Sequence, residues 1–164
     1  MRSGSVWLLV KNILFTVLVP AAVGVYVPLW IAGGPIPPPA WGWRTLAGVC
    51  LLTVGAAGYV WCQSWFAIFG RGTPAPIDPP RRLVIRGPYQ VVRNPMYVSV
   101  LLVVLGWSVY LRSSPLLLYA GALWVVLHTF VVVIEEPSLR RRFGDAYVQY
   151  CRNVRRWMPT THRS

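Results

Sequence analysis

The 164-residue chain has the length of a single domain, but its composition excludes an ordinary soluble one. Hydrophobic residues make up 55% of the chain and charged residues only 12%, which is about half the usual charged share. The net charge of +12 does not indicate a nucleic-acid partner, because the basic residues lie between long uncharged segments and form no single stripe. We therefore expect a membrane protein that associates with the lipid bilayer and binds no nucleic acid.

Four uncharged segments predict four membrane-spanning helices. They cover residues 12–43, 45–70, 94–111 and 113–134, with lengths of 32, 26, 18 and 22 residues. About 20 apolar residues are enough to cross a bilayer, so the third segment is close to the minimum length. The predicted fold class is an all-α membrane protein with about four transmembrane helices and a C-terminal amphipathic interfacial helix.

The distribution of basic residues predicts the orientation in the membrane. Fourteen of the sixteen lie in the N-terminal segment, the loop between the second and third spans, and the tail. The loops on the opposite side carry only Arg44 and Arg112. Because basic residues concentrate on the cytoplasmic side, we expect both termini and the 70–95 loop of this multi-pass protein to be cytoplasmic.

The first two spans form the predicted N-terminal region, residues 1–69. The first runs from about Val6 to Ile31 and contains Pro20, which predicts a kink. After a proline-rich loop, the second runs from about Thr45 to Phe69. Small residues on this second span predict a face for close helix packing, namely Gly48, Gly55, Ala56, Ala57 and Gly58.

Residues 70–164 form the predicted catalytic region, which begins with a long loop. Prolines and glycines exclude a continuous helix over residues 70–93, and long loops of this kind are more often functional than idle. Spans three and four form a hairpin that turns at residues 113–115, with Ser114 as N-cap and Pro115 at the first helical position. A tight hairpin returns both cytoplasmic ends to one side, so residues 94–97 should lie near Glu135 and Glu136.

The tail is predicted to form one amphipathic helix. Its apolar residues recur at spacings of four, four, three, four and three, which defines one helical face: Leu139, Phe143, Tyr147, Tyr150, Val154 and Trp157. Most of the tail arginines fall elsewhere. A basic amphipathic helix of this kind lies in the membrane interface or docks on the cytoplasmic face of the protein.

Glu135 and Glu136 are the strongest candidates for chemistry, because the whole chain has only four acidic residues. We expect them where the fourth span leaves the membrane. Carboxylates at a helix C-terminus oppose the helix dipole, so a functional interpretation is a site for a cationic group such as an amine or a sulfonium. The alternative is a solvated helix end neutralised by nearby arginines such as Arg140.

Other polar residues have two interpretations each. Arg86 and Arg93 are either ligands of an anionic group or ordinary cytoplasmic arginines, and Tyr89 and Tyr97 are either site residues or interface aromatics. His128 is either functional or a neutral histidine hydrogen-bonded to a neighbouring helix. The sequence contains no Cys/His cluster with metal-ligand spacing, so no metal site is expected.

Two sequence blocks resemble a known family. The loop motifs Gly87-Pro88-Tyr89 and Val92-Arg93-Asn94-Pro95-Met96-Tyr97 are similar to those of isoprenylcysteine carboxyl methyltransferases and the related phospholipid N-methyltransferases. The second block matches the C-terminal pattern of that family: Glu135-Glu136-x-x-Leu139-x-x-x-Phe143-Gly144-x-x-Tyr147-x-x-Tyr150-x-x-x-Val154-x-Arg156-x-x-Pro159. Together the blocks cover about residues 78–159. Neither block alone is specific, but two blocks joined by a two-span hairpin are.

The resemblance implies an integral membrane methyltransferase that uses S-adenosylmethionine and methylates a hydrophobic or lipid-like acceptor. It places the cofactor at the cytoplasmic face, between the loop and the glutamate pair. The implied cofactor-binding residues are Arg86, Gly87, Pro88, Tyr89, Arg93, Asn94, Pro95, Tyr97, Glu135 and Glu136.

Within this set, Glu135 or Glu136 is expected to bind the cofactor's ammonium group, and Arg93 or Arg86 its carboxylate. Arg93 and Glu136 are the predicted catalytic residues. Glu136 is the candidate base, which a thiol or amine acceptor would require.

The sequence departs from the family pattern at two positions. Asn94 stands where many relatives have histidine, and Ser99 stands where a glycine is common. Asn94 can still form hydrogen bonds, so we expect cofactor binding to survive, whereas a role that needs an imidazole proton is in doubt.

Two other functions fit the same sequence. One is an NADPH-dependent membrane reductase of the sterol-reductase type, in which Arg71, Arg81 and Arg82 would contact the 2′-phosphate. The other is a non-enzymatic membrane scaffold, which would tolerate changes in the loop and in the glutamate pair.

Overall fold

The computed structural model describes residues 18–34, 36, 38, 42–65, 68 and 83–159, and this part of the chain is helical without a β-strand. The predicted start of the first span at Val6 and most of the long loop, including Arg71, Arg81 and Arg82, lie outside the described residues. The elements in chain order are a π-helical turn (Ala22–Tyr26), α2 (Val27–Ala32), α3 (Trp43–Trp65), a 3₁₀ turn (Gly87–Gln90), α4 (Pro95–Tyr110), α5 (Ser114–Phe130), a second π-helical turn (Val131–Glu135), α6 (Glu136–Phe143) and α7 (Asp145–Asn153).

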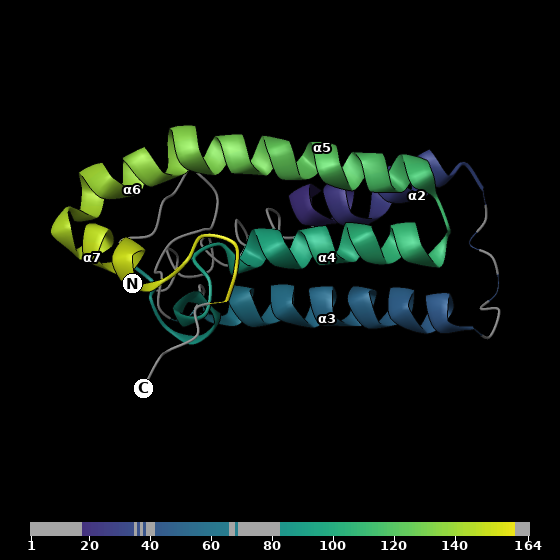
Figure 1. The fold of residues 1–164 in the computed structure, drawn as a ribbon, viewed down its shortest axis with the longest axis horizontal. Coiled ribbons are helices and arrows are strands. Elements are labelled where there is room, and N and C mark those ends of the chain that lie inside the picture. Colours follow the sequence, from purple (N-terminus) through teal and green to yellow (C-terminus); the bar gives the residue numbers. More distant parts are fainter. Residues whose placement is uncertain are drawn as a thin grey trace, which may run out of the picture.

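Helices α3, α4 and α5 run side by side along the long axis of the molecule (Figure 1), α2 packs against α5, and the π-helical turn before α2 packs against α4. The short turn between α4 and α5 confirms the predicted hairpin, with Ser113 rather than Ser114 as the N-cap and Pro115 at the start of the helix. Helices α6 and α7 lie at the opposite end from this turn, beside the segment that precedes α4 (Figure 1). The hairpin therefore brings the segment that precedes α4 close to α6 and α7.

Glycines allow α3 and α4 to pack in close contact. A Cβ atom at Gly48 would lie 2.8 Å from Cβ of Tyr110, and one at Gly55 would lie 2.7 Å from the carbonyl oxygen of Ser99. Gly106 of α4 similarly faces the backbone of Leu52. These contacts confirm the glycines of the predicted small-residue face, whereas Ala56 and Ala57 are exposed and do not belong to it. The glycine contacts also join the two regions predicted on either side of residue 69 into one helical body, while the boundary itself stays a prediction.

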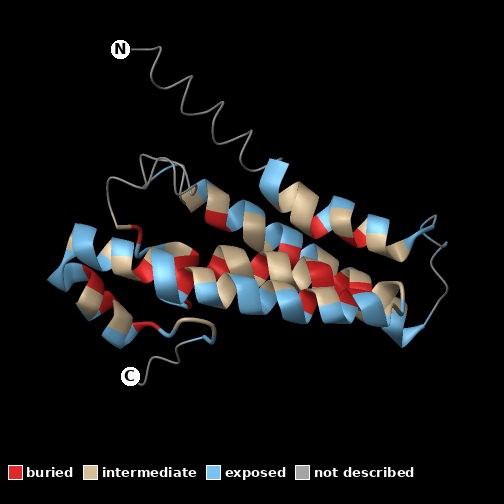
Figure 2. Cartoon of the chain, turned by 90° about the horizontal axis from the view of Figure 1, so that it is seen from above, coloured by how far each residue is buried: buried red, intermediate tan, exposed pale blue. Residues whose placement is uncertain are grey.

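Two described helices are long and apolar enough to cross a membrane. They are Trp43–Trp65, with a mean hydropathy of 1.6, and the continuous helix Ser114–Phe143, with a mean hydropathy of 2.3. Leu18–Ala32 and Pro95–Tyr110 are also apolar but shorter, so the prediction of four spans is met only in part. Buried residues follow the lines where helices meet, and the outer helix faces are exposed (Figure 2). Large apolar side chains such as Trp30 and Leu118 lie on exposed positions, as expected for helices in contact with lipid.

The fourth predicted span does not end at Glu135. Its helix continues without a break through the π-helical turn and α6 to Phe143. The wider π turn accommodates Pro137, which cannot donate a backbone hydrogen bond and would crowd a regular helical turn. The prediction that the glutamates stand at a helix C-terminus, exposed to an unfavourable dipole, is therefore wrong.

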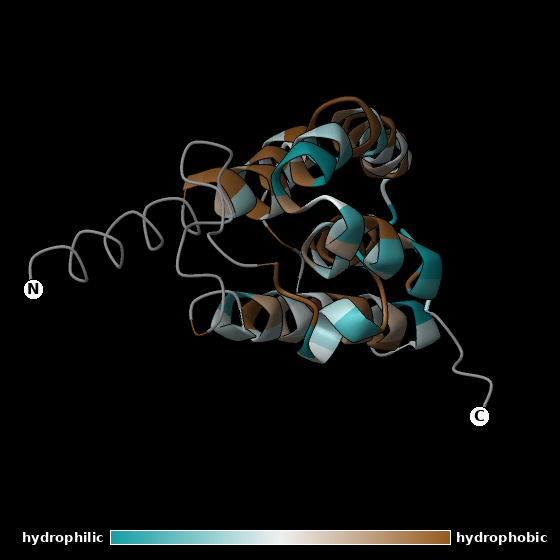
Figure 3. Ribbon diagram, turned by 90° about the vertical axis from the view of Figure 1, so that its left-hand side faces the viewer, coloured by the Kyte–Doolittle hydropathy of each residue, from teal (hydrophilic) through white to brown (hydrophobic). Residues whose placement is uncertain are grey.

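The prediction of one amphipathic helix through Trp157 is also wrong. Gly144 separates α6 from α7 with φ 53° and ψ −132°, a conformation that glycine adopts without the strain of a side chain. Val154 is extended and ends α7, so Trp157 lies beyond the helix. The apolar residues still gather: Tyr147, Tyr150 and Val154 are buried together, with Leu83, Leu139, Phe143 and Cys151 packed against them. Hydrophilic residues are prominent at this end of the molecule (Figure 3).

Candidate active site

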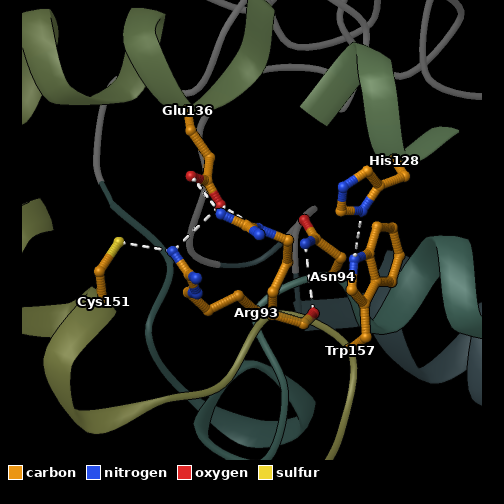
Figure 4. Close-up of polar contacts among 7 residues, drawn as sticks. Arg93, Asn94, His128, Glu136, Cys151 and Trp157 are labelled. Atoms are coloured by element: carbon orange, nitrogen blue, oxygen red, sulfur yellow. Dashed lines mark hydrogen bonds and ion pairs between the residues drawn. The ribbon is translucent and has the colours of Figure 1, made fainter. Parts of the chain in front are cut away.

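Glu136 is the centre of a buried cluster of charges. Its carboxylate accepts two hydrogen bonds from Arg156, from Nε at 2.7 Å and from Nη2 at 3.0 Å. Nη1 of Arg93 lies 3.1 Å from the same carboxylate, and Glu136 as a whole residue is only 5% exposed. Figure 4 shows Arg93 and Glu136 facing each other from different parts of the chain. A buried carboxylate needs such partners, because an unpaired charge away from water is costly.

The contacts with Glu136 also stabilise the charged form of the Arg156 guanidinium. Its hydrogen bonds with Glu136 raise the pKa of Arg156 above the ordinary value, so this arginine stays charged. The two parallel contacts form the fork-like pairing that holds an arginine and a carboxylate in one orientation. Arg156 therefore fixes the direction of the Glu136 side chain.

Glu135 has a different partner. Its Oε2 atom accepts a hydrogen bond of 2.9 Å from the Tyr97 hydroxyl on the first turns of α4. No arginine, lysine or histidine of the described residues forms an ion pair with Glu135. The two neighbouring glutamates thus differ: Glu136 is neutralised by two arginines, whereas Glu135 is held by a neutral hydroxyl.

The 3₁₀ turn forms the floor beside these charges. Pro88 and Tyr89 are buried, and the Tyr150 hydroxyl of α7 donates a 2.6 Å hydrogen bond to the Tyr89 carbonyl. Burial raises the pKa of Tyr89 well above its ordinary value, which keeps the phenol neutral. Gly87 has φ 60°, and a Cβ atom there would lie 2.5 Å from the Trp65 ring, so only glycine fits.

The segment after α7, residues 154–159, returns to the start of α4 and is here called the tail segment. The backbone N–H of Arg93 donates to the Arg155 carbonyl at 2.9 Å, and the Asn94 side-chain amide donates to the Arg156 carbonyl at 3.3 Å. The Trp157 indole donates to Nδ1 of His128 at 3.0 Å. These contacts hold the tail segment across the site (Figure 4).

Cys151 and His128 complete the surroundings of the charged cluster. Nη1 of Arg93 lies 2.6 Å from the Cys151 sulfur. His128 stacks on Trp124 with ring centroids 5.3 Å apart, and it accepts the indole proton of Trp157 on Nδ1. His128 is thus hydrogen-bonded within the protein, as one of its two interpretations expected, but the partner lies in the tail segment and not on a neighbouring helix.

Most of the predicted site residues meet in space. Arg93, Asn94, Tyr97, Glu135 and Glu136 are joined by direct contacts or by shared partners. The residues before them provide the shape of the loop, with Gly87, Pro88 and Tyr89 in the 3₁₀ turn and Pro95 at the start of α4. Arg86 precedes this turn and is exposed. Of the two arginines predicted for the site, Arg93 is the one that pairs with Glu136.

Sequence reasoning missed three contributors: Arg156, Cys151 and Trp157. Arg156 stood in the C-terminal pattern, which was the available signal, but no role was assigned to it. Cys151 and Trp157 had no signal of this kind, because their contacts depend on the reversal of the chain at Gly144 and Val154.

The described residues form a largely apolar helical fold, with two helices long enough to cross a membrane and a buried charged cluster at one end. Residues 43–146, from the start of α3 into α7, match the model of the phospholipid methyltransferase family, and the chain belongs to that family. This membership indicates a membrane methyltransferase. The chain is also 38% identical, over 63 residues, to an uncharacterized protein of Haemophilus influenzae; the match covers 38% of this chain and all of that protein.

Proposed function

We propose that this protein is an integral membrane methyltransferase that uses S-adenosylmethionine and acts on a hydrophobic or lipid-like acceptor. The observation that carries the proposal is the charged cluster at the end of the apolar helices. Within the described residues, Nε of Arg93 has no hydrogen-bond acceptor there, and Glu135 has no cationic partner. The family membership agrees with methyl transfer.

The charges of the site suit the two ends of an amino-acid group. Nε of Arg93 is buried, and no atom of the described residues accepts a hydrogen bond from it. A buried donor without an acceptor is rare in proteins, and a ligand carboxylate would satisfy it. Glu135, which has no cationic partner in the described part of the chain, suits an ammonium group. The residues present therefore fit the methionine part of the cofactor.

The sequence left open which of the two glutamates binds the ammonium group, and the contacts favour a different role for each. Glu135 would bind the ammonium group and Arg93 the carboxylate, while Glu136 and Arg156 would hold Arg93 in place. Tyr97 would orient Glu135 through the hydrogen bond between them. Tyr89 and the 3₁₀ turn would provide the apolar wall next to these charges.

S-adenosylmethionine would supply an electrophilic methyl group on a positively charged sulfonium. The chain's own contribution is to orient the reactants and to keep water away, and both effects lower the barrier to methyl transfer. A carboxylate acceptor would need no base, whereas a thiol or amine acceptor would. The role of Glu136 as that base stays a prediction. Its contacts with two guanidinium groups argue against this role, because they stabilise the charged carboxylate and make it a weaker base.

The proposed topology has four spans, with both termini and the 70–95 loop in the cytoplasm. The two long apolar helices and the two shorter ones provide the four segments. The basic residues of α6 and of the tail segment lie at the same end of the molecule as Arg93, which agrees with one cytoplasmic face. A lipid-like acceptor would then approach from the bilayer.

The test is calorimetric titration of the detergent-purified protein with S-adenosylmethionine, with NADPH in parallel. We expect saturable binding of S-adenosylmethionine only. Glu135→Gln removes the charge but keeps the shape, and it should weaken binding by about 10- to 100-fold, the effect of losing a charged hydrogen bond. Asp145→Asn removes one charge from an exposed position on α7 and serves as the matched control, with unchanged affinity.

Other outcomes would contradict the proposal. Binding of NADPH alone would support a reductase, and binding of neither compound would support a scaffold. Equal affinity of the wild type and the Glu135→Gln variant would refute the assignment of Glu135 but not the use of the cofactor.

A further inference from the structure

Two helices of the chain contain the same local device, a π-helical turn followed by a proline. The turn Ala22–Tyr26 precedes Pro28, and the turn Val131–Glu135 precedes Pro137, with one residue in between in each case. In both turns a backbone N–H bonds to the carbonyl five residues earlier, from Val27 to Ala22 and from Glu136 to Val131. Proline has no N–H and crowds the preceding turn of a helix, so the wider turn relieves that crowding.

The device leaves two backbone carbonyls without their regular helical donors. At the first turn these carbonyls belong to Val23 and Gly24, and side chains of other helices replace the lost donors. The Tyr119 hydroxyl donates to Val23 at 3.0 Å, and the Trp107 indole donates to Gly24 at 3.1 Å. The first turn is therefore satisfied as a structural joint between helices.

The second turn is different. Among the described residues, no side chain donates to the corresponding carbonyls of Val132 and Val133. The contacts here are instead made by the last residue of the turn and by the residue after it: Glu135 accepts from Tyr97 at 2.9 Å, and Glu136 pairs with Arg93 at 3.1 Å. The partners lie only four residues apart, at the start of α4.

We propose that Pro137 is a positioning residue, which maintains the π turn Val131–Glu135 so that Glu135 faces Tyr97 while Glu136 remains paired with Arg93. Neighbouring residues of an α-helix are rotated by about 100° about its axis. In a π turn, which has more residues per turn than an α-helix, neighbouring residues are rotated by a smaller angle about the axis. The two adjacent carboxylates are thereby brought into a narrower sector, in which both can reach the short segment from Arg93 to Tyr97.

The geometry of this proposal concerns the protein alone, whereas its consequence for cofactor affinity rests on the proposed function. Pro137→Ala restores a backbone N–H and allows a regular α-helical turn. The matched control is Pro28→Ala, which makes the same change at the turn where Tyr119 and Trp107 occupy the freed carbonyls. Each change is combined with Tyr97→Phe, which removes the hydrogen bond to Glu135.

The first measurement is thermal unfolding in detergent without any ligand. In the wild-type and Pro28→Ala backgrounds, Tyr97→Phe should lower the melting temperature by about 2–4 °C, as expected for one hydrogen bond in a chain of this size. In the Pro137→Ala background the same change should have almost no effect, because Glu135 no longer faces Tyr97. Non-additivity of this kind reports a coupling that a general loss of stability does not produce.

The second measurement is the affinity for S-adenosylmethionine. Pro137→Ala should weaken it by about tenfold, comparable to the loss of one interaction at Glu135, and Pro28→Ala should leave it unchanged. If the wild type binds no S-adenosylmethionine, the proposed function fails, and the unfolding experiment still tests Pro137.

An equal effect of Tyr97→Phe in the wild-type and Pro137→Ala backgrounds would overturn the proposal. Pro137→Ser is a second variant that restores the same N–H. Failure of both variants to fold would also overturn it, because Pro137 would then be required by the fold itself and not for the direction of Glu135.

Discussion

At the scale of single residues, Glu136 is a buried carboxylate whose charge is balanced by two arginines, Arg93 and Arg156. The side chains of Glu136 and Arg93 are 7% and 11% exposed, whereas that of Arg156 is 30% exposed. Removing one member of a buried ion pair leaves the other charge without compensation. The consequence of a substitution should therefore depend on how deeply the remaining charges are buried.

Glu136→Gln is the first test at this scale. We expect it to lower the free energy of unfolding by about 3–5 kcal/mol, since it leaves Arg93 buried without its counter-ion. Arg156→Ala should cost less, because Glu136 then retains Arg93 and the lost arginine is partly in solvent. Thermal or denaturant unfolding in detergent measures both, with Asp145→Asn as the exposed control. A larger loss for Arg156→Ala than for Glu136→Gln would contradict this order.

At the scale of helices, the contact of α3 with α4 depends on the absence of side chains at particular positions. Gly48, Gly55 and Gly106 each lie so close to the partner helix that a Cβ atom would approach it to within 2.7–2.8 Å. A side chain at any of these positions would contact the partner helix more tightly than van der Waals packing permits. The two helices would then have to move apart or the chain would be strained.

Gly55→Ala tests this contact. The added methyl group meets the backbone oxygen of Ser99 and the side chain of Val103, so we expect a loss of about 1–3 kcal/mol in the free energy of unfolding. Gly121→Ala on α5 is the matched control, because among the described residues no atom outside its own helix lies within 4 Å of the added position. Alanine there should be neutral or should stabilise the helix by up to about 1 kcal/mol. Equal stability of the two variants would show that the α3–α4 contact relaxes freely.

The helices and turns also differ in how well they could be predicted from the sequence. The hairpin and the glycine face were predictable because they depend on local signals, a Ser-Pro turn and small residues on one helical face. The proximity of residues 94–97 to the two glutamates followed from the hairpin alone, and the Tyr97–Glu135 hydrogen bond agrees with it. Two features were not predictable: the π turn before Pro137, in a helix that was expected to end at the glutamate pair, and the reversal of the chain at Gly144, which brings Arg156 and Trp157 to the site.

At the scale of the whole molecule, the orientation in the membrane is the main open prediction. The helix Ser114–Phe143 should cross the bilayer with Ser114 outside and the basic residues 140–142 in the cytoplasm. In a background with Cys50 and Cys151 replaced by serine, a membrane-impermeant maleimide should label Ser114→Cys in intact cells. It should label Asp145→Cys only after the cells are permeabilised. Labelling of Asp145→Cys in intact cells and of Ser114→Cys only after permeabilisation would reverse the proposed orientation.

The hydrogen bonds of the tail segment also constrain the order in which the protein can be made. The Asn94–Arg156 and Tyr89–Tyr150 contacts join residues 62 and 61 positions apart in the chain, and contacts of long range form late in folding. Residues 154–159 are synthesised after the α4–α5 hairpin, since the chain is made and begins to fold from its N-terminal side. The charged cluster around Glu136 can therefore be completed only after the hairpin has been made, when Arg156 becomes available as the second partner of that carboxylate.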